Sequence, residues 1–238
     1  MIAAIVLDIE GTTSSLSHVR DHFFPYSRQR VSEWLRRSDE DISRIVEEVR
    51  AAVDRPAASL DEVAAVLREW IDADLKTAPL KSLQGLIWRA GFATGELVSH
   101  VYEDVPAALR AWRADGVDLH VFSSGSVLAQ QLWFRHTQHG DLSELLSGHF
   151  DTVNAGPKRE PGSYAAIGAA IDVPADRILF LSDTAAELDA ARMAGWRAVQ
   201  VIRPDDGTQP AAGHPSVAAL DDVRLDDILP TPHPGGLK

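Results

Sequence analysis

Residues 2–13 read IAAIVLDIEGTT, and this stretch decides how the rest of the chain is interpreted. The apolar run of residues 2–7 has no basic residue before it and is too short to cross a membrane, so it fits a buried strand. Asp8 follows the run directly, and Gly11 allows the backbone to turn sharply. We therefore predict a strand that delivers an acid to its carboxyl end.

Apolar runs of the same kind recur along the chain, at residues 117–122, 178–181 and 198–202, with a shorter one at 150–153. Most of them lead into polar or glycine-bearing residues and then into helical spacing. Runs that are apolar on both faces are typical of parallel strands with helices on each side. The sequence predicts an α/β fold, a doubly wound, Rossmann-like parallel sheet.

The stretch between the first two strands is different, because residues 25–91 show helical spacing only. Ser59 and Glu62 form a capping box at the start of one of these helices. We expect residues 16–99 to form a helical cap inserted after the first strand, and residues 1–15 with 100–238 to form the catalytic core. Residues from Arg203 onward are rich in Pro, Gly and Asp, and we expect a tail at about residues 230–238.

The composition excludes several classes of function. The chain has no cysteine, which excludes disulfides, thiolate metal sites and cysteine nucleophiles. Its formal net charge of −12 argues against nucleic acid or an anionic membrane as partner. A small phosphorylated substrate stays compatible, since a metal ion and local cations can hold it. We expect a cytoplasmic protein.

Acidic side chains close two of the predicted strands. Asp8 and Glu10 can point the same way from the end of the first strand, and Asp183 ends the apolar run at 178–182. A lone acid at such a position is often a turn or helix cap. A carboxylate that closes a buried run is costly without a partner, however, and we favour a metal ligand for Asp183.

Two other strand ends carry groups that suit an anion. Ser123 and Ser124 follow the strand at 117–122, where hydroxyl and free N–H groups form an oxyanion cradle. Lys158 follows the run at 150–153 and supplies a compact cation. Because the carboxyl ends of parallel strands meet at one sheet edge, these groups and the acids are predicted to share one pocket. Together they suit phosphoryl transfer through a covalent intermediate on Asp8.

This order of Asp-x-acid, strand-end serine, lysine and final aspartate resembles the haloacid-dehalogenase-like superfamily. The usual opening of that superfamily is Asp-x-Asp, whereas here it is Asp8-Ile9-Glu10. Leu7–Thr13 resembles the opening of one branch, the enolase-phosphatases. Further matches extend over most of the chain, namely Phe24–Tyr26, Leu83–Gly85, Ser123–Val127, Gly140–Leu142, Phe150–Thr152, Gly156, Lys158 and Phe180–Asp183.

The resemblance implies a role for each matched residue. Asp8 would be both the nucleophile and a ligand of one magnesium ion per subunit. Glu10 would bind this ion through its main-chain carbonyl and use its side chain as acid or base. Asp183 would complete the metal site.

The remaining implied roles concern the substrate. Ser123, Ser124 and Lys158 would hold its phosphate. The family converts a phosphorylated diketone, 2,3-diketo-5-methylthiopentyl-1-phosphate, to its enol and then to the acireductone in L-methionine salvage. The resemblance also suggests a monomer.

Two rival interpretations stay open at this point. One is another small-molecule phosphatase of the same superfamily. The other is a receiver-like binding module that carries a stable aspartyl-phosphate, although receivers lack an inserted helical cap.

Overall fold

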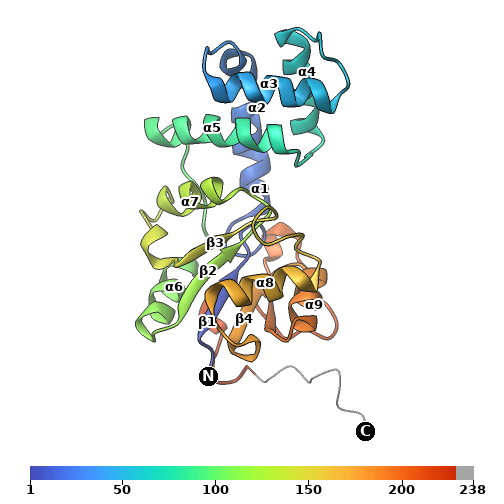
Figure 1. Ribbon diagram of the computed structural model, residues 1–238. Helices are drawn as coiled ribbons and strands as arrows, with labels where there is room; N and C mark the ends of the chain where they lie inside the picture. The colour runs from blue at the N-terminus through green and yellow to red at the C-terminus, as the bar shows by residue number, and fades with distance from the viewer. Residues whose placement is uncertain (229–238) are drawn as a thin grey trace. The chain divides into compact units, whose positions relative to one another are not determined.

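The computed structural model describes residues 1–228 (Figure 1). The predicted tail at residues 230–238 lies outside the described residues. The chain separates into two compact units, which are described here one at a time. The core unit contains Met1–Leu16 and the described residues from Ser99 onward, and the insert contains Ser17–Val98.

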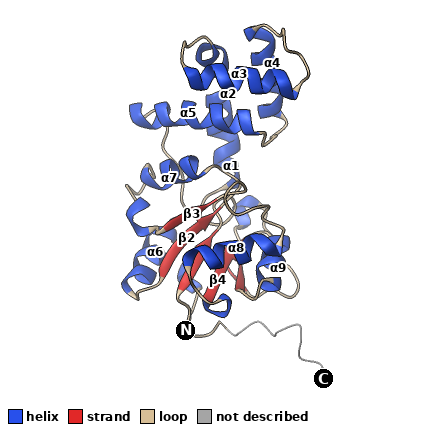
Figure 2. Ribbon diagram, viewed as in Figure 1, coloured by secondary structure: helices blue, strands red, loops and turns tan. Residues whose placement is uncertain are grey.

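A single parallel sheet forms the centre of the core unit, and Figure 2 shows its strands in red. Within the described residues the strand order is β3-β2-β1-β4-β5-β6. The strands are β1 (Ala4–Leu7), β2 (Asp118–Phe122), β3 (Gly148–Phe150), β4 (Ile178–Ser182), β5 (Arg197–Val201) and β6 (Ser216–Val217). All neighbouring pairs are parallel. The predicted α/β fold class is confirmed.

Helices connect the strands of this sheet. They are α6 (Val105–Ala114), α7 (Val127–Arg135), α8 (Pro161–Ile171) and α9 (Ala185–Met193), with short turns η2 (Ser143–Leu145), η3 (Ala175–Arg177), η4 (Pro204–Asp206) and η5 (Leu220–Asp222). Tyr164 of α8 is fully buried, and its ring contacts those of Phe122 and Phe180 on one face of the sheet. Side chains that alternate with these, such as Leu7 and Leu181, point to the opposite face.

The third strand differs from the sequence prediction. Residues 150–153 were expected to form it, but β3 ends at Phe150. Asp151 ends the strand, because its Oδ1 atom accepts the N–H groups of Val153 and Asn154 and so forms a tight turn. Val153 is 87% exposed, so the apolar residue at the end of the run lies in a surface turn.

The insert is entirely helical in its regular structure. Its elements are α1 (Leu16–His18), η1 (Val19–Phe23), α2 (Phe24–Leu35), α3 (Glu40–Ala52), α4 (Leu60–Asp72) and α5 (Ala78–Thr94). The predicted capping box starts α4, since Glu62 N donates to Ser59 Oγ and Ser59 N donates to Glu62 Oε2.

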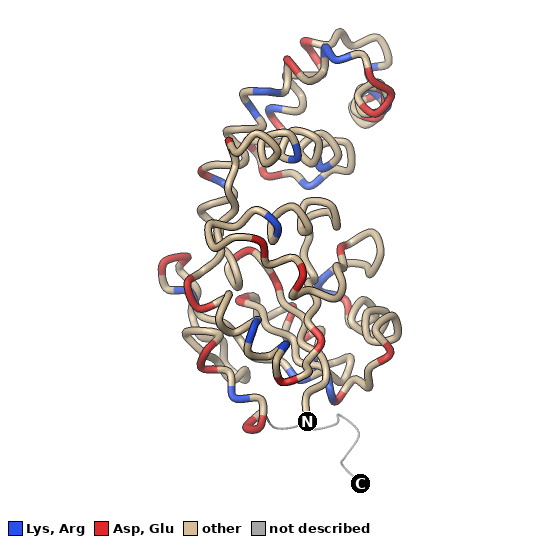
Figure 3. The backbone as a smooth tube through the Cα atoms, turned by 90° about the vertical axis from the view of Figure 1, so that its left-hand side faces the viewer, with Lys and Arg blue, Asp and Glu red and all other residues tan. Residues whose placement is uncertain are grey.

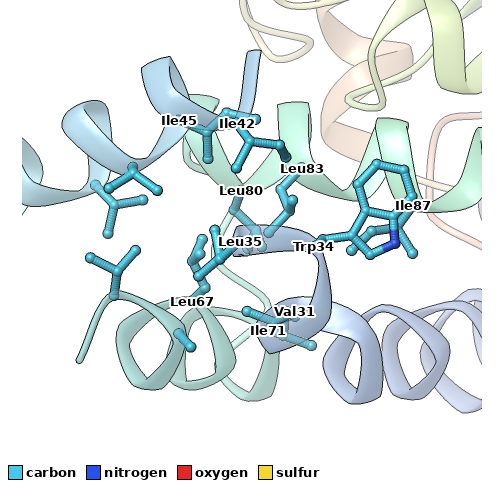
Figure 4. Close-up of a cluster of buried hydrophobic side chains, with 14 of the residues drawn as sticks. Val31, Trp34, Leu35, Ile42, Ile45, Leu67, Ile71, Leu80, Leu83 and Ile87 are labelled. Carbon is cyan, nitrogen blue, oxygen red and sulfur yellow. The ribbon is translucent and has the colours of Figure 1, made fainter. Parts of the chain in front are cut away.

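Four helices of the insert share one apolar core, shown in Figure 4. Its labelled side chains are Val31, Trp34, Leu35, Ile42, Ile45, Leu67, Ile71, Leu80, Leu83 and Ile87. These side chains come from α2, α3, α4 and α5, and each is at most 7% exposed. Burial of this size stabilises a helical unit by about 1.5–3 kcal/mol for each large side chain.

Charged residues of both signs are interspersed along both units (Figure 3). This pattern differs from the basic stripe that nucleic-acid binding requires. In residues 1–228, every helix is too short or too polar to span a membrane.

Candidate active site

The strand order places the candidate site at a topological switch point. From β1 the chain adds β2 and β3 on one side, and it then returns to add β4 on the other side (Figure 1). Strand β5 follows next to β4. Right-handed connections then leave β1 and β4 toward opposite faces of the sheet. In such sheets the crevice beyond the carboxyl ends of these two strands is where ligands bind.

The register brings the predicted residues to this edge. Leu7 of β1 pairs with Val121 of β2 and with Leu181 of β4. Asp8 therefore follows one residue beyond this level, and Ser123 and Asp183 follow two residues beyond it. The three side chains start from neighbouring strands at the same end of the sheet.

Asp8 and Lys158 form a buried ion pair. Lys158 Nζ lies 2.6 Å from Asp8 Oδ1, and the two side chains are 8% and 7% exposed. The backbone fixes both partners: Asp8 N donates to Leu181 O at 2.9 Å, and Tyr164 Oη donates to Lys158 O at 2.7 Å. The nucleophile and the cation predicted from sequence are thus in direct contact.

A second carboxylate, that of Glu187, also binds the lysine. Glu187 Oε2 lies 2.6 Å from Lys158 Nζ and accepts a hydrogen bond from Ser182 Oγ at 3.1 Å. Burial alone would lower the pKa of Lys158, but the charges of Asp8 and Glu187 raise it above the ordinary lysine value. The ammonium therefore stays charged between two acids. A charged ammonium at this place can bind an anion such as phosphate.

Glu187 was not among the predicted site residues. Burial, and then the negative charge of Asp8, raise the pKa of Glu187 to about 7. Its position did carry a signal, because it stands four residues after Asp183, in the first turn of α9. A buried acid at that place faces the strand end and needs a partner. Lys158, 29 residues earlier in the sequence, could not be identified as that partner without the fold.

The loop after β1 contacts Asp183 and fixes its position. Its N–H donates to Thr12 Oγ1 at 2.9 Å, and its Oδ1 accepts from Thr184 Oγ1 at 3.1 Å. Gly11 has a φ of +78°, and a Cβ atom there would lie 2.6 Å from Asp183 Oδ2. Only glycine lets the backbone pass this close to the carboxylate.

Asp8 and Asp183 repel each other at this edge. Burial, and then the charge of Asp8, raise the pKa of Asp183 to about 6. A divalent cation between two carboxylates would relieve this repulsion. Mg²⁺ prefers oxygen ligands and commonly takes one or two carboxylates, with water and a substrate phosphate completing the shell.

The oxygen atoms at this edge fit a magnesium ion that takes only a few of its ligands from the protein. Among residues 1–228, His, Asp and Glu side chains do not gather in threes or more as a ready metal site. Asp8 and Asp183 supply two carboxylates, and a main-chain carbonyl of the intervening turn would have to supply a further protein ligand. A shell with so few protein ligands suits an ion that also binds water or a phosphate group.

Glu10 lies in the tight turn after β1, half-buried and one residue before Gly11. Hydrogen bonds within the turn hold it in place: Gly11 N donates to Ser14 O at 2.7 Å, and the side chain of Thr13 donates through Oγ1 to Asp8 O at 3.0 Å. Glu10 also forms an isolated bridge with Ser14. The main chain around Glu10 is thus fixed close to Asp8.

The loop after β2 carries the two predicted serines. Ser123 is 5% exposed, and its Oγ accepts the N–H of Gly125 at 3.2 Å. Ser124 is half-buried in the same loop. Ser126 then caps α7, since its Oγ accepts from Ala129 N at 3.3 Å. Hydroxyl groups at the start of a helix form an environment that favours an anion.

A buried glutamine that was not among the predicted site residues supports this loop. Gln130 Nε2 donates to Gly125 O at 2.9 Å and to Phe150 O at 2.7 Å, which joins the loops after β2 and β3. Asp151 adds a second link, because its Oδ2 accepts from Val127 N at 3.1 Å. The serine loop is held by two side chains from outside it.

Comparison with known proteins identifies the family. The model of the haloacid dehalogenase-like hydrolases matches residues 2–195. A Streptomyces avermitilis protein named enolase-phosphatase E1 is 56% identical over 207 residues, which cover 86% of this chain and 87% of that protein. A Frankia alni protein of the same name is 49% identical over 223 residues, which cover 93% and 94%.

Solved structures share the fold of this chain. The crystal structure of the UTR4 protein from Saccharomyces cerevisiae is similar, with a TM-score of 0.80 at 29% identity over 94% of this chain and 100% of that chain. CbbY from Rhodobacter sphaeroides, solved in complex with phosphate, shares the fold, with a TM-score of 0.61 at 18% identity over 93% and 96%. The resemblance found in the sequence is confirmed, and the chain belongs to the enolase-phosphatase E1 family of haloacid dehalogenase-like hydrolases.

Proposed function

We propose that this chain is a magnesium-dependent enolase-phosphatase of L-methionine salvage. Its substrate is the phosphorylated diketone 2,3-diketo-5-methylthiopentyl-1-phosphate, which it converts to the enol and then to acireductone and phosphate. The observation that carries the proposal is the buried contact of Lys158 with Asp8, at 2.6 Å, beside Asp183 at the switch point of the sheet. Its relatives named enolase-phosphatase E1 supply the substrate class.

The phosphatase step uses Asp8 as the nucleophile. An Asp8 carboxylate oxygen attacks phosphorus, a P–O bond forms, and the bond to the enol oxygen breaks, with its electrons passing to the leaving enol. Water then attacks the aspartyl-phosphate at phosphorus, which releases phosphate and restores Asp8. Lys158 neutralises the phosphate oxygens, and Ser123 and Ser124 donate hydrogen bonds to them.

The enolase step moves a proton. The phosphate-bearing carbon of the substrate adjoins a carbonyl, so a base can remove its proton while negative charge develops on the carbonyl oxygen. Glu10 is the base in this proposal, because its turn is fixed next to Asp8. The same carboxyl group can protonate the leaving enol oxygen in the second step.

Asp8, Asp183 and the main-chain carbonyl of Glu10 would hold Mg²⁺. When bound, the ion offsets the charge between carboxylate and phosphate and stabilises the developing enolate oxygen. Burial at this edge strengthens these electrostatic effects.

A turnover assay on the diketo-phosphate tests the proposal. The enol absorbance and free phosphate are followed in the same reaction, with and without Mg²⁺. We expect enol to form before phosphate, and both to require the ion. Equal or faster turnover of generic phosphate esters would replace the proposal with another small-molecule phosphatase. One stoichiometric burst without turnover would replace it with a binding module.

Glu10→Gln tests the division of roles. We expect enol formation to fall by about 10²-fold or more, the range for loss of a general base. Direct phosphate release from a simple aryl phosphate should fall less, because an aryl leaving group needs little protonation. Enol formation at the full rate with slowed phosphate release would show that Glu10 is not the enolisation base.

The cytoplasmic location and the monomeric state expected from the sequence stay predictions. Sedimentation at micromolar concentration would test the second of them.

A further inference from the structure

The segment after β5 makes buried polar contacts that its Pro-, Gly- and Asp-rich composition did not predict. Arg203 is 5% exposed, although it opens a region rich in Pro, Gly and Asp. Asp206 ends η4, three residues later. Both residues reach back almost the full length of the chain to the segment that follows β1, residues 10–16, which is called the turn segment below.

Arg203 binds the turn segment on its main chain. Its Nε donates to Thr12 O at 2.9 Å, and its Nη1 and Nη2 form a bidentate pair with Asp104 at 3.0 and 2.9 Å. Its guanidinium also lies 4.0 Å from the centre of the Tyr102 ring. A planar guanidinium that makes several hydrogen bonds and lies over an aromatic ring fixes the positions of the groups that it binds.

Thr12 also binds the main chain of Asp183, which is a proposed metal ligand. While its carbonyl accepts from Arg203, its Oγ1 accepts the N–H of Asp183 at 2.9 Å. Arg203 therefore lies two hydrogen bonds away from the backbone of Asp183.

Asp206 binds the end of the turn segment and also the chain that returns from the insert. Its Oδ1 accepts from Ser15 Oγ at 2.7 Å, and its Oδ2 accepts from Leu16 N at 3.0 Å. Tyr102 Oη donates to the same Oδ2 atom in a short hydrogen bond. Burial and this carboxylate raise the pKa of Tyr102, so the phenol stays a donor.

The two chain segments also bind each other. Tyr102 N donates to Thr13 O at 3.0 Å, and Ser15 N donates to His100 Nδ1 at 3.1 Å. The hydrogen bond from Gly11 N to Ser14 O, which shapes the Glu10 turn, lies directly next to the residues that Asp206 holds.

We propose that Arg203 and Asp206 are positioning residues for the reaction, which hold the turn segment so that Glu10 and Asp183 keep their working geometry. The inference rests on the proposed function for the roles of Glu10 and Asp183. Neither Arg203 nor Asp206 touches the substrate in this account. Loss of either residue would keep Glu10 and Asp183 in the protein but would let their positions shift. A displacement of about 1 Å costs up to roughly 10²-fold in rate.

The experiment compares three single variants, and a double variant that combines Asp206→Asn with Tyr102→Phe, with the wild type. Asp206→Asn keeps the shape but removes the charge that Ser15, Leu16 and Tyr102 share. Tyr102→Phe removes one donor to the same carboxylate and keeps the ring. Asp205→Asn is the matched control, because Asp205 is the neighbouring aspartate of η4 and is exposed.

Two readouts are taken at a temperature at which all variants are folded. The first is kcat and KM for the diketo-phosphate and for p-nitrophenyl phosphate. The second is hydrogen exchange of peptides that cover residues 9–16, measured without substrate. It does not depend on any activity.

We expect Asp206→Asn to lower kcat about tenfold or more, with KM within about threefold, and to speed exchange in residues 9–16. Tyr102→Phe should do the same to a smaller extent, and the double variant should resemble Asp206→Asn, because both act through one contact. Asp205→Asn should match the wild type.

Two results would overturn the inference. One is unchanged exchange in residues 9–16 of Asp206→Asn. The other is a lower melting temperature of that variant with unchanged kcat on both substrates, which a purely structural role would give. A wild type that hydrolyses p-nitrophenyl phosphate but not the diketo-phosphate would contradict the proposed function, and the exchange and p-nitrophenyl phosphate data would still decide this inference.

Discussion

The core unit and the insert each contain an ion pair of nearly the same length in opposite surroundings. Lys158 and Asp8 are 2.6 Å apart, with side chains 8% and 7% exposed. Arg28 and Asp72 of the insert are 2.7 Å apart, with side chains 48% and 53% exposed. An exposed pair of this kind contributes about 0–1 kcal/mol, whereas loss of one partner of a buried pair costs about 3–5 kcal/mol.

The difference shows where each unit places its charges. The insert is held by the apolar core of α2 to α5 and leaves the Arg28–Asp72 pair exposed to water. The core unit has an equally apolar sheet, yet it buries Asp8, Lys158 and Glu187 together at one edge. Burying three charges together is energetically costly, and charged groups with strongly shifted pKa values cluster at functional sites.

The largest expected effect comes from removing the buried cation. Lys158→Met leaves two carboxylates without their partner, so we expect the free energy of unfolding at neutral pH to fall by about 3 kcal/mol or more. Arg28→Met is the matched change in the insert, and it should cost less than about 1 kcal/mol. Urea unfolding followed by circular dichroism measures both.

Activity separates the same two variants further. We expect Lys158→Met to lower phosphate release by roughly 10³-fold, the upper range for loss of one electrostatic stabiliser. Arg28→Met should leave it within about twofold of the wild type. Similar losses of stability in the two variants would contradict the contrast between buried and exposed pairs.

Two glycines with left-handed backbone conformations, one in each unit, extend the comparison between the core unit and the insert. Gly11 in the core and Gly95 in the insert have φ values of +78° and +73°. A Cβ on Gly95 meets nothing within 4 Å, whereas one on Gly11 would lie 2.6 Å from Asp183 Oδ2. Gly95→Ala should therefore cost only the strain of a left-handed residue, about 1–2 kcal/mol.

Gly11→Ala should add a displaced carboxylate to that strain. We expect a larger loss of stability than for Gly95→Ala and a fall in kcat of about 10²-fold. Thermal unfolding and phosphate release measure the two effects. Equal kcat values for the two variants would show that the close approach of Gly11 to Asp183 has no role in the reaction.

The smallest expected effect concerns buried histidines. Burial lowers the pKa of His120 on β2, nearby Asp118 raises it, and Arg113 lowers it further. The unfolded chain binds this proton near pH 6.5, so the folded state loses stability as the pH falls below that value. His120→Gln should reduce this loss by at most about 1.4 kcal/mol for each pH unit.

His18 in the insert is the comparison for this effect. Burial also lowers its pKa, but a hydrogen bond to Val98 O opposes the shift, and the side chain is only half-buried. His18→Gln should therefore change the pH dependence less than His120→Gln. Urea unfolding at pH 7.5 and pH 5.5 tests this, and the reverse order would contradict it.

The fold was largely predictable because its main signals are local. The apolar runs that end at Asp8, at Ser123 and at Asp183 became β1, β2 and β4, and the Ser59 capping box starts α4 as expected. Each of these features depends on residues that lie close together in the sequence. Parallel strands then bring their carboxyl ends to one edge.

The rest could not be predicted because it depends on distant contacts. Strand β6 has only two residues and therefore no periodicity. The role of Glu187 is visible only from its contact with Lys158. The role of Asp206 is visible only from its contact with Ser15, a residue 191 positions away. The apolar residues at 150–153 indicated a strand, but hydrogen bonds to the side chain of Asp151 form a turn directly after Phe150.

The most direct test of the central claim is a search for the phosphoryl group on Asp8. The wild type is mixed with diketo-phosphate and Mg²⁺, quenched in acid within one turnover, and digested for mass spectrometry of the N-terminal peptide. We predict a phosphoryl group on Asp8, and in the Asp8→Asn variant neither this group nor turnover. Phosphate release at the wild-type rate by Asp8→Asn, or a phosphoryl group on any other residue, would contradict the account.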